Sequence, residues 1–261
     1  MGFRPYSWLD QMARRIAASS WASIGKKAPA MRPAHLRALR ADAAGLSADL
    51  DRFLMMSAER VHASRAELAT LPLPAGTDWR WRPEFLDGAI RKHGIAAPQS
   101  GAKLTEGAAI WHDCPASALI FKQIRNVDST DLAAFGLQLE TFNFSGSFLS
   151  LSVDLPEHVL NGLTREHIIR LELVVRMERD QEVYARLNIG SGPNTEEVIR
   201  HLGSLQPGNT NSQVIEFDLA LTEMNEKRLD KAWLDLIFEK PVMNAASIRE
   251  MIFSRHLRAN V

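Results

Sequence analysis

Apolar and polar side chains alternate most clearly in the second half of the chain. In residues 167–178, HIIRLELVVRME, every second position is apolar, and the positions between are mainly Arg and Glu. A period of two is typical of a strand with one buried face in an antiparallel sheet. Residues 183–189 repeat the pattern, so the intervening Arg179-Asp180-Gln181 is predicted to be a hairpin turn.

Further strands are predicted where the alternation returns, at 118–124, 214–221, 233–239 and 247–255. Two short helices are predicted among them. Asn194 and Glu197 form a capping box before the first, and Thr222 caps the second. Short strands without regular βαβ alternation indicate the α+β class, with residues 75–261 as an antiparallel β-sandwich of jelly-roll type.

The apolar positions change parity within FNFSGSFLSLSVDLP, residues 142–156. Phe142 and Phe144 occupy even positions, whereas the leucines and valine from Leu149 onward occupy odd ones. Ser145-Gly146-Ser147 is therefore predicted to be a tight hairpin or a glycine bulge that exchanges the faces of the strand.

The N-terminal 72 residues have a helical pattern instead. Residues 7–25 and 34–70 both place apolar side chains at steps of three and four, and Pro33 suits a first helical turn. The two helices are predicted either to form a hairpin or to let the longer one self-associate into a homo-oligomer. The chain is thus expected to divide into a helical region, 1–72, and the sandwich, 75–261.

Charge separates the same two regions. The whole chain has a formal net charge of zero, so nucleic acid is not an expected partner. Residues 1–40 hold eight Lys or Arg against one Asp, a net charge of +7. The single Cys114 fits a reducing cytoplasm, and no segment predicts a membrane span or a secretory signal.

The basic first helix is a candidate for attachment at an anionic surface. The apolar side and the Arg pair of this helix suit attachment to the cytoplasmic face of the inner membrane. They also suit a protein partner that binds through residues 1–70. The alternative is a helix packed on the rest of the chain. The residues concerned are Trp8, Met12, Arg14, Arg15, Ile16 and Trp21.

No sequence motif predicts a metal site or a cofactor. The histidines show no metal-ligand spacing, and the glycine-rich IGSGPNTEE lacks the Lys of a P-loop. His112-Asp113-Cys114 contains the residue types of a nucleophilic set, but neighbours on an extended chain point to opposite faces. A strand-edge turn is the favoured interpretation of that tripeptide.

Carboxylates and tryptophans supply two competing hypotheses of function. Paired carboxylates could hydrolyse or cleave a glycan, with Asp235, Glu239 and Glu140 as candidates. Alternatively, Trp79 and Trp81 share a face and could stack on sugar rings, unless both indoles anchor their strand to the core. Polar groups that could line the same cleft are Arg186, Asn188, Asn194 and Asn225.

Four segments resemble an uncharacterised alphaproteobacterial family, a domain of unknown function. They are FSGSFLSLSVDLP, YARLNIGSGPNTE, FDLALTEMNEKRLDKAWLDLIFEKP and the terminal SRHLRA. The resemblance implies a bacterial cytoplasmic protein and supplies no activity or site residue.

The leading hypothesis is a non-enzymatic protein with a carbohydrate-binding-like sandwich, attached to a membrane surface or partner by its helices. The alternatives are a glycan-active hydrolase or lyase and an oligomeric assembly adaptor.

Overall fold

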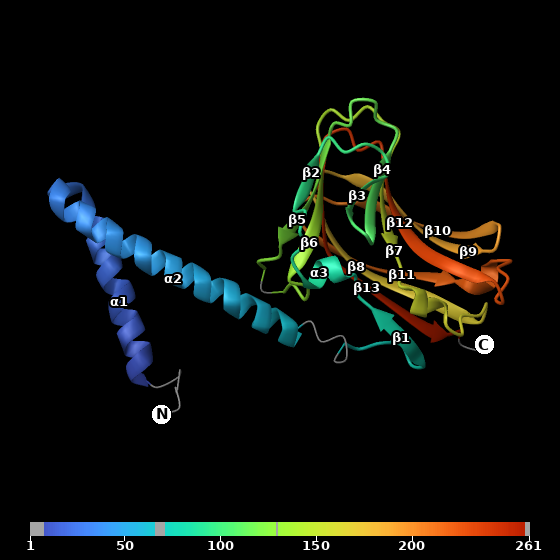
Figure 1. The fold of residues 1–261 in the computed structure, drawn as a ribbon, viewed down its shortest axis with the longest axis horizontal. Helices are drawn as coiled ribbons and strands as arrows, with labels where there is room; N and C mark the ends of the chain where they lie inside the picture. The colour runs from blue at the N-terminus through green and yellow to red at the C-terminus, as the bar shows by residue number, and fades with distance from the viewer. Residues whose placement is uncertain (1–7, 66–70, 129, 259–261) are drawn as a thin grey trace. The chain divides into compact units, whose positions relative to one another are not determined.

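The computed structural model describes residues 8–65, 71–128 and 130–258 (Figure 1). Contacts between residues divide the chain into two compact units, Met1–Ala58 and Glu59–Val261. Each unit is described by itself below. The domain ranges 1–72 and 75–261 stay a prediction.

The helical region contains α1 (Trp8–Lys27), the 3-10 turn η1 (Ala28–Ala30) and α2 (Pro33–Arg65). Both predicted helices are confirmed over the described residues, while 66–70 lie outside them. Pro33 starts α2 because a first-turn residue needs no N–H partner. Of the described helices, none is long and apolar enough to cross a membrane.

Apolar side chains of this region remain exposed. Met12 and Ile16 on α1 are 51% and 58% exposed, and Leu46, Leu50 and Phe53 on α2 are exposed as well. The surface that would cover them, whether membrane or protein, therefore stays a prediction.

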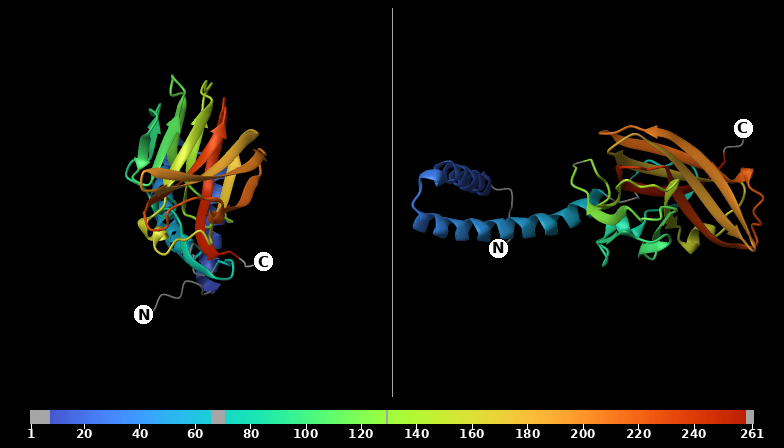
Figure 2. Two further views of the ribbon diagram at one scale, coloured as in Figure 1. Left: turned by 90° about the vertical axis from the view of Figure 1, so that its right-hand side faces the viewer. Right: turned by 90° about the horizontal axis from the view of Figure 1, so that it is seen from above.

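The rest of the chain forms two antiparallel sheets, seen from further directions in Figure 2. Sheet A has the order β11-β8-β13-β6-β5-β2, with β1 paired to β13, and sheet B has the order β10-β9-β12-β7-β4-β3. The strands of sheet A are β1 (Thr77–Trp81), β2 (Gly94–Ala96), β5 (Leu119–Arg125), β6 (Phe135–Thr141), β8 (His167–Met177), β11 (Thr210–Asp218) and β13 (Asn244–Leu257). Those of sheet B are β3 (Ala102–Thr105), β4 (Ala108–His112), β7 (Phe148–Asp154), β9 (Gln181–Ser191), β10 (Asn194–Leu205) and β12 (Leu229–Glu239). Within the described part of the sandwich, three short helical segments connect strands: α3 (Glu84–Asp87), η3 (Glu157–Leu160) and η4 (Leu219–Leu221).

The predicted antiparallel β-sandwich preceded by a helical region is confirmed. Successive strands repeatedly change sheets, as in a jelly roll, and alternate side chains of both sheets fill one apolar core. The strands predicted at 118–124, 233–239 and 247–255 are confirmed as parts of β5, β12 and β13. The strand predicted at 214–221 ends at Asp218, whose carboxylate accepts the Ala220 N–H and begins η4.

The Ser145-Gly146-Ser147 segment is neither a hairpin nor a bulge. It connects β6 in sheet A to β7 in sheet B, and odd positions are buried in both strands. Phe144 reaches the core from the connection itself, whereas Phe142 is 48% exposed. The change of parity is therefore confined to the connection between the two sheets, where Phe142 and Phe144 lie.

Three other local predictions are wrong. Arg179-Asp180-Gln181 is no hairpin turn, since β8 and β9 belong to different sheets. The helix predicted after Asn194 is strand β10, which pairs with β9 throughout its length. The helix predicted after Thr222 is a loop followed by β12; Thr222 instead ends η4, and its hydroxyl donates to the Leu219 carbonyl.

Candidate functional site

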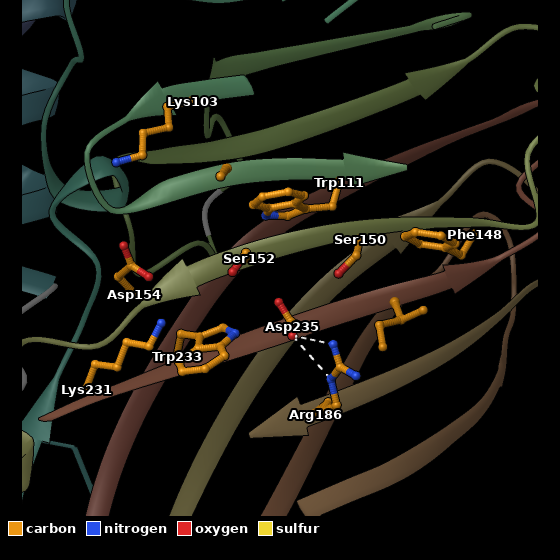
Figure 3. A pocket seen from close by; sticks show the side chains of 12 residues that line it. Lys103, Trp111, Phe148, Ser150, Ser152, Asp154, Arg186, Lys231, Trp233 and Asp235 are labelled. Atoms are coloured by element: carbon orange, nitrogen blue, oxygen red, sulfur yellow. Dashed lines mark hydrogen bonds and ion pairs between the residues drawn. The ribbon is translucent and has the colours of Figure 1, made fainter. Parts of the chain in front are cut away.

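A groove of about 610 Å³ crosses the outer face of sheet B (Figure 3). Inward positions of these strands fill the core, so the alternate positions line the groove. Strand register places Trp111 beside Ser150, Ser152 beside Asp235, and Asp154 beside Trp233. The groove is therefore assembled from residues far apart in the chain.

Small side chains make the floor between the two indoles. Ala109 and Ser152 face each other across β4 and β7, in the register row between Trp111 and Trp233. The Ser150 hydroxyl is buried and has no hydrogen-bond partner among the described residues. A floor of this kind leaves room for a ligand and offers it a polar contact.

Aromatic side chains stand at the two ends. Trp111 on β4 is 49% exposed and Phe148 on β7 is 37% exposed. Trp233 on β12 is half-buried, and the Lys231 ammonium lies 4.2 Å from its ring centroid. Rings of this type bind apolar faces, and the cation–π contact holds Lys231 at the groove.

Asp235 lies in the groove as a buried, oriented carboxylate. Its Oδ2 atom accepts hydrogen bonds from Arg186 Nη2 and from Asn188 Nδ2, both at 2.9 Å. No hydrogen bond from another described residue reaches Oδ1. Figure 3 shows Oδ1 pointing away from Arg186, toward the side of Ser150 and Ser152. Asp235 thus presents one fixed acceptor to the groove.

The remaining charges lie at the Trp233 end. Lys103, Lys231 and Asp154 line this part of the groove, and Lys103 also contacts Glu106 at 3.4 Å. Among the described residues, no group of His, Cys, Asp and Glu could hold a metal ion. The arrangement offers rings, hydroxyl groups and charged hydrogen-bonding groups to a ligand.

A family model matches the chain over residues 1–261. The chain belongs to DUF6478, a family of unknown function. Membership covers the helical region as well as the sandwich. The predicted resemblance to a family of unknown function is confirmed, and its alphaproteobacterial origin stays a prediction. The search of curated proteins finds no match.

Several solved structures are similar to this DUF6478 chain at low identity. The CBM22-1 xylan-binding domain from Paenibacillus barcinonensis Xyn10C aligns with a TM-score of 0.39 and 8% identity, covering 64% of this chain and 94% of that domain. The family 11 carbohydrate-binding module from Clostridium thermocellum has a TM-score of 0.41 and 7% identity, covering 69% and 96%. The enzymatically active domain of bacteriophage CBA120 tailspike protein 4 has a TM-score of 0.41 and 8% identity. That match covers 59% of this chain and 20% of the tailspike chain.

Trp79 and Trp81 lie on β1 of sheet A, away from the groove. Trp79 is 8% exposed and packs edge-on against His158, with 6.0 Å between ring centroids. Trp81 is half-buried and packs against Phe253. The structure thus places both indoles as anchors of β1 to the core, and Trp79 has no free face for stacking.

The four predicted polar groups separate into two pairs. Arg186 lines the groove, and Asn188 orients Asp235 from beneath it. Asn194 and Asn225 both lie near Ser191: Asn194 is its partner in register, and the Asn225 N–H donates to its hydroxyl at 2.8 Å. Asn194 and Asn225 are therefore not among the residues that line the groove.

The three candidate catalytic carboxylates do not converge. Glu140 is on β6 of sheet A and pairs with Lys122 at 2.8 Å, whereas Asp235 is on sheet B. Glu239 shares the outer face with Asp235, but four residues along a strand separate their Cα atoms by about 13 Å. The structure assembles no carboxylate pair from these residues.

His112-Asp113-Cys114 forms a structural turn, as favoured from the sequence. His112 Nδ1 accepts the Cys114 N–H at 3.2 Å, and Asp113 accepts the Ser147 N–H and hydroxyl. Burial raises the pKa of the Cys114 thiol, but hydrogen bonds from nearby backbone N–H groups and the Ser145 hydroxyl outweigh it, leaving the pKa at about 7.

The candidate attachment residues lie on α1. Met12, Arg14, Arg15 and Ile16 are exposed, and Trp21 is half-buried. The side chain of Trp8 lies outside the described residues.

Sequence reasoning missed Trp111 and Trp233. A usable signal existed for Trp233, because it shares parity with Asp235 and Glu239 in WLDLIFE. Alternation separates two faces of a strand but does not say which face is buried.

Proposed function

We propose that this protein is a non-enzymatic glycan-binding protein whose sandwich holds the sugar in the groove on sheet B. The observation that carries the proposal is an exposed indole, Trp111, across a small-residue floor from Trp233, with the free Oδ1 of Asp235 beside that floor. Sugars present apolar ring faces and hydroxyl donors together, and this groove has a partner for each.

Stacking supports the proposal first. About half of the Trp111 surface is exposed although its neighbours Ile110 and His112 are buried. An exposed indole on a strand contributes nothing to the core and costs little to cover with a ligand. A sugar ring on this indole would bury apolar area without needing a charged partner.

Hydrogen bonding supports it second. A carboxylate oxygen accepts strong hydrogen bonds from hydroxyl groups, and Asp235 Oδ1 is held in one orientation by Arg186 and Asn188. Because these groups are already placed, a ligand would not need to order them on binding. Ser150, which lines the groove and whose buried hydroxyl has no partner among the described residues, is a second polar group beside this site.

The positions and hydrogen bonds of the carboxylates favour binding over hydrolysis. Of the three candidate carboxylates, neither Glu140 nor Glu239 lies beside Asp235 in register. Asp154 lines the groove one register row away, but Asp235 is already engaged by Arg186 and Asn188, and this engagement favours binding. Glycoside cleavage needs two carboxyl groups about 5–9 Å apart on either side of the bond.

The helical region is proposed to attach the sandwich to an anionic membrane surface. Met12 and Ile16 are exposed on the helix that also carries Arg14 and Arg15. Apolar and basic side chains on one surface helix suit the interface of an anionic bilayer.

A glycan array with the full-length protein tests the binding proposal. Fragments of bacterial polysaccharides are the probe. We expect selective binding that Trp111→Ala weakens about tenfold, because stacking contributes about 1.4 kcal/mol.

Phe142→Ala is the matched control, because it removes an aromatic side chain that is 48% exposed outside the groove. It should bind as the wild type does. No binding by any folded form, or equal losses in the two variants, would refute the proposal.

A further inference from the structure

The outer face of sheet B carries a second aromatic surface beyond the groove. One register row crosses five strands from β4 to β10, and its members are Trp111, Ser150, Ile237, Tyr184 and His201. Ile237 lines the groove, and Tyr184 is its neighbour on β9. The groove floor therefore continues to Tyr184 without an intervening strand.

Tyr184 is held in place by its own neighbours. Its ring stacks on His201 with centroids 4.6 Å apart and planes 22° apart. The His201 Nε2 and Glu182 Oε2 atoms lie 2.6 Å apart, so Glu182 also holds the imidazole in place. Tyr184 is half-buried, while the His201 side chain is 51% exposed. A ring fixed in this way binds a ligand with little loss of entropy.

The three rings are not in line. From the spacing between strands and the rise per residue, the Cα atoms of Trp111 and Trp233 lie about 17 Å apart. The diagonal line between them passes over Ser152. The same spacings place Tyr184 about 12 Å to one side of this diagonal, beyond Asp235 and Ile237. A linear chain that contacts both indoles passes beside Asp235 and does not reach Tyr184.

We infer that the ligand is a branched glycan, whose main chain lies between Trp111 and Trp233 and whose branch passes over Ile237 to stack on Tyr184. This inference rests on the proposed function. In register, Asp235 lies between Ser152 on the diagonal and Arg186 on the strand of Tyr184, and its Oδ1 points toward Ser150 and Ser152 (Figure 3). It can therefore accept a hydroxyl near the branch point. The Tyr184–His201 pair then serves as the binding surface for the branch.

Paired oligosaccharides test the inference with the full-length protein. Each pair shares one backbone, with and without single-sugar branches, such as cellotetraose and the xyloglucan heptasaccharide, and equivalent pairs come from mannans, xylans and α-glucans. For a backbone that binds, we expect the branched member to bind about tenfold more tightly, by the free energy of one stacked ring.

Variants separate the branch surface from the main groove. Tyr184→Ala should reduce the affinity for the branched member to that of the linear one and leave the linear affinity unchanged, which also shows that the variant is folded. Tyr184→Phe, which keeps the ring, should retain the preference, and Trp111→Ala should weaken both members.

The outcomes distinguish this inference from the proposed function. A linear member that binds as well as every branched one would overturn the branch surface alone. A Tyr184→Ala protein that still prefers the branched member would overturn it too. Tyr184 would then only stabilise the packing between β9 and β10. If no member of any pair binds, the proposed function fails and the inference fails with it.

Discussion

Arg82 is a buried residue that connects the segment after β1 to Glu250 on β13 and to Asp87 on α3. Its Nε and Nη2 atoms donate to the two carboxylate oxygens of Glu250, each at 2.8 Å, and Nη1 donates to Asp87. The side chains of Arg82 and Glu250 are 1% and 5% exposed. Removing the guanidinium would leave a buried carboxylate uncompensated, which costs far more than the pair contributes.

Arg82→Leu is therefore expected to lower the free energy of unfolding by about 3–5 kcal/mol, measured by urea denaturation. Arg80→Leu, at an exposed position on β1 two residues before Arg82, is the control and should change the free energy of unfolding by less than about 0.5 kcal/mol. Similar values for the two variants would contradict the role given to Arg82.

Asp78 makes folding stability depend on pH. Hydrogen bonds from Arg255, at 2.9 and 2.7 Å, lower the pKa of Asp78 below its usual range. Because the folded pKa lies below the unfolded one, the stabilisation is present above about pH 4 and is lost as the pH falls through the folded pKa.

In Asp78→Asn this contribution is missing at neutral pH, so less stability should be lost on acidification. Urea denaturation at a series of pH values from 7 downward, on the wild type and the variant, measures the difference. Parallel pH profiles would show that the Asp78–Arg255 pair does not contribute.

The tryptophans differ in how far the sequence predicted their exposure. The alternation around Trp79 predicted a strand. An anchor in the core was one of the two interpretations of its indole. Trp111 and Trp233 belong to strands on which both faces carry apolar residues, so alternation left their exposure undecided. Register between distant strands brought them together, and no local pattern encodes that register.

At the scale of elements, the connection from β6 to β7 depends on a close approach at Gly146. A Cβ atom there would lie 2.6 Å from Phe144 Cε1 and 2.9 Å from the Cys114 nitrogen, and would also contact the Asp113 carboxylate. The Asp113 carboxylate accepts the Ser147 N–H at 2.8 Å. Displacing this carboxylate to make room for a Cβ would break the hydrogen bond that holds the connection.

Gly146→Ala is expected to lower the free energy of unfolding by about 1–3 kcal/mol, measured by urea denaturation, because the extra methyl group overpacks this connection. Gly107→Ala is the matched control, since a Cβ there meets nothing within 4 Å. An unchanged stability in Gly146→Ala would show that the loop rearranges at no cost.

The strands were predictable and their partners were not. Period-two alternation identified β8, β9 and β12, because each strand buries one face. The segment after Asn194 carries a capping box, yet pairing with β9 overrides this local preference and makes it a strand. Short connections such as 178–180, between β8 and β9, look like hairpin turns in sequence even when they cross between sheets.

At the scale of the whole molecule, we expect the helical region to carry a function separate from that of the groove. Vesicles of mixed phosphatidylglycerol and phosphatidylcholine should co-sediment the full-length protein, and Arg14→Ala/Arg15→Ala should reduce this binding. Each basic residue near an anionic surface contributes about 1 kcal/mol, so added salt should reduce it too.

Arg80→Ala/Arg176→Ala removes the same charge from exposed positions of the sandwich and should leave vesicle binding unchanged. Vesicle binding that resists both added salt and Arg14→Ala/Arg15→Ala would contradict attachment through α1. A protein partner would then be the better explanation of the exposed Met12 and Ile16.

A glycan held in the groove on sheet B would change the surroundings of the indole N–H groups there, so their NMR resonances give a direct test of binding. The full-length protein, labelled with ¹⁵N, is titrated with a bacterial polysaccharide hydrolysate, and the Trp signals are assigned by single Trp→Phe substitutions. We expect the signals of Trp111 and Trp233 to shift while that of the buried Trp79 stays in place. Shifts confined to Trp79 and Trp81, or no shift in any indole signal, would contradict binding in the groove.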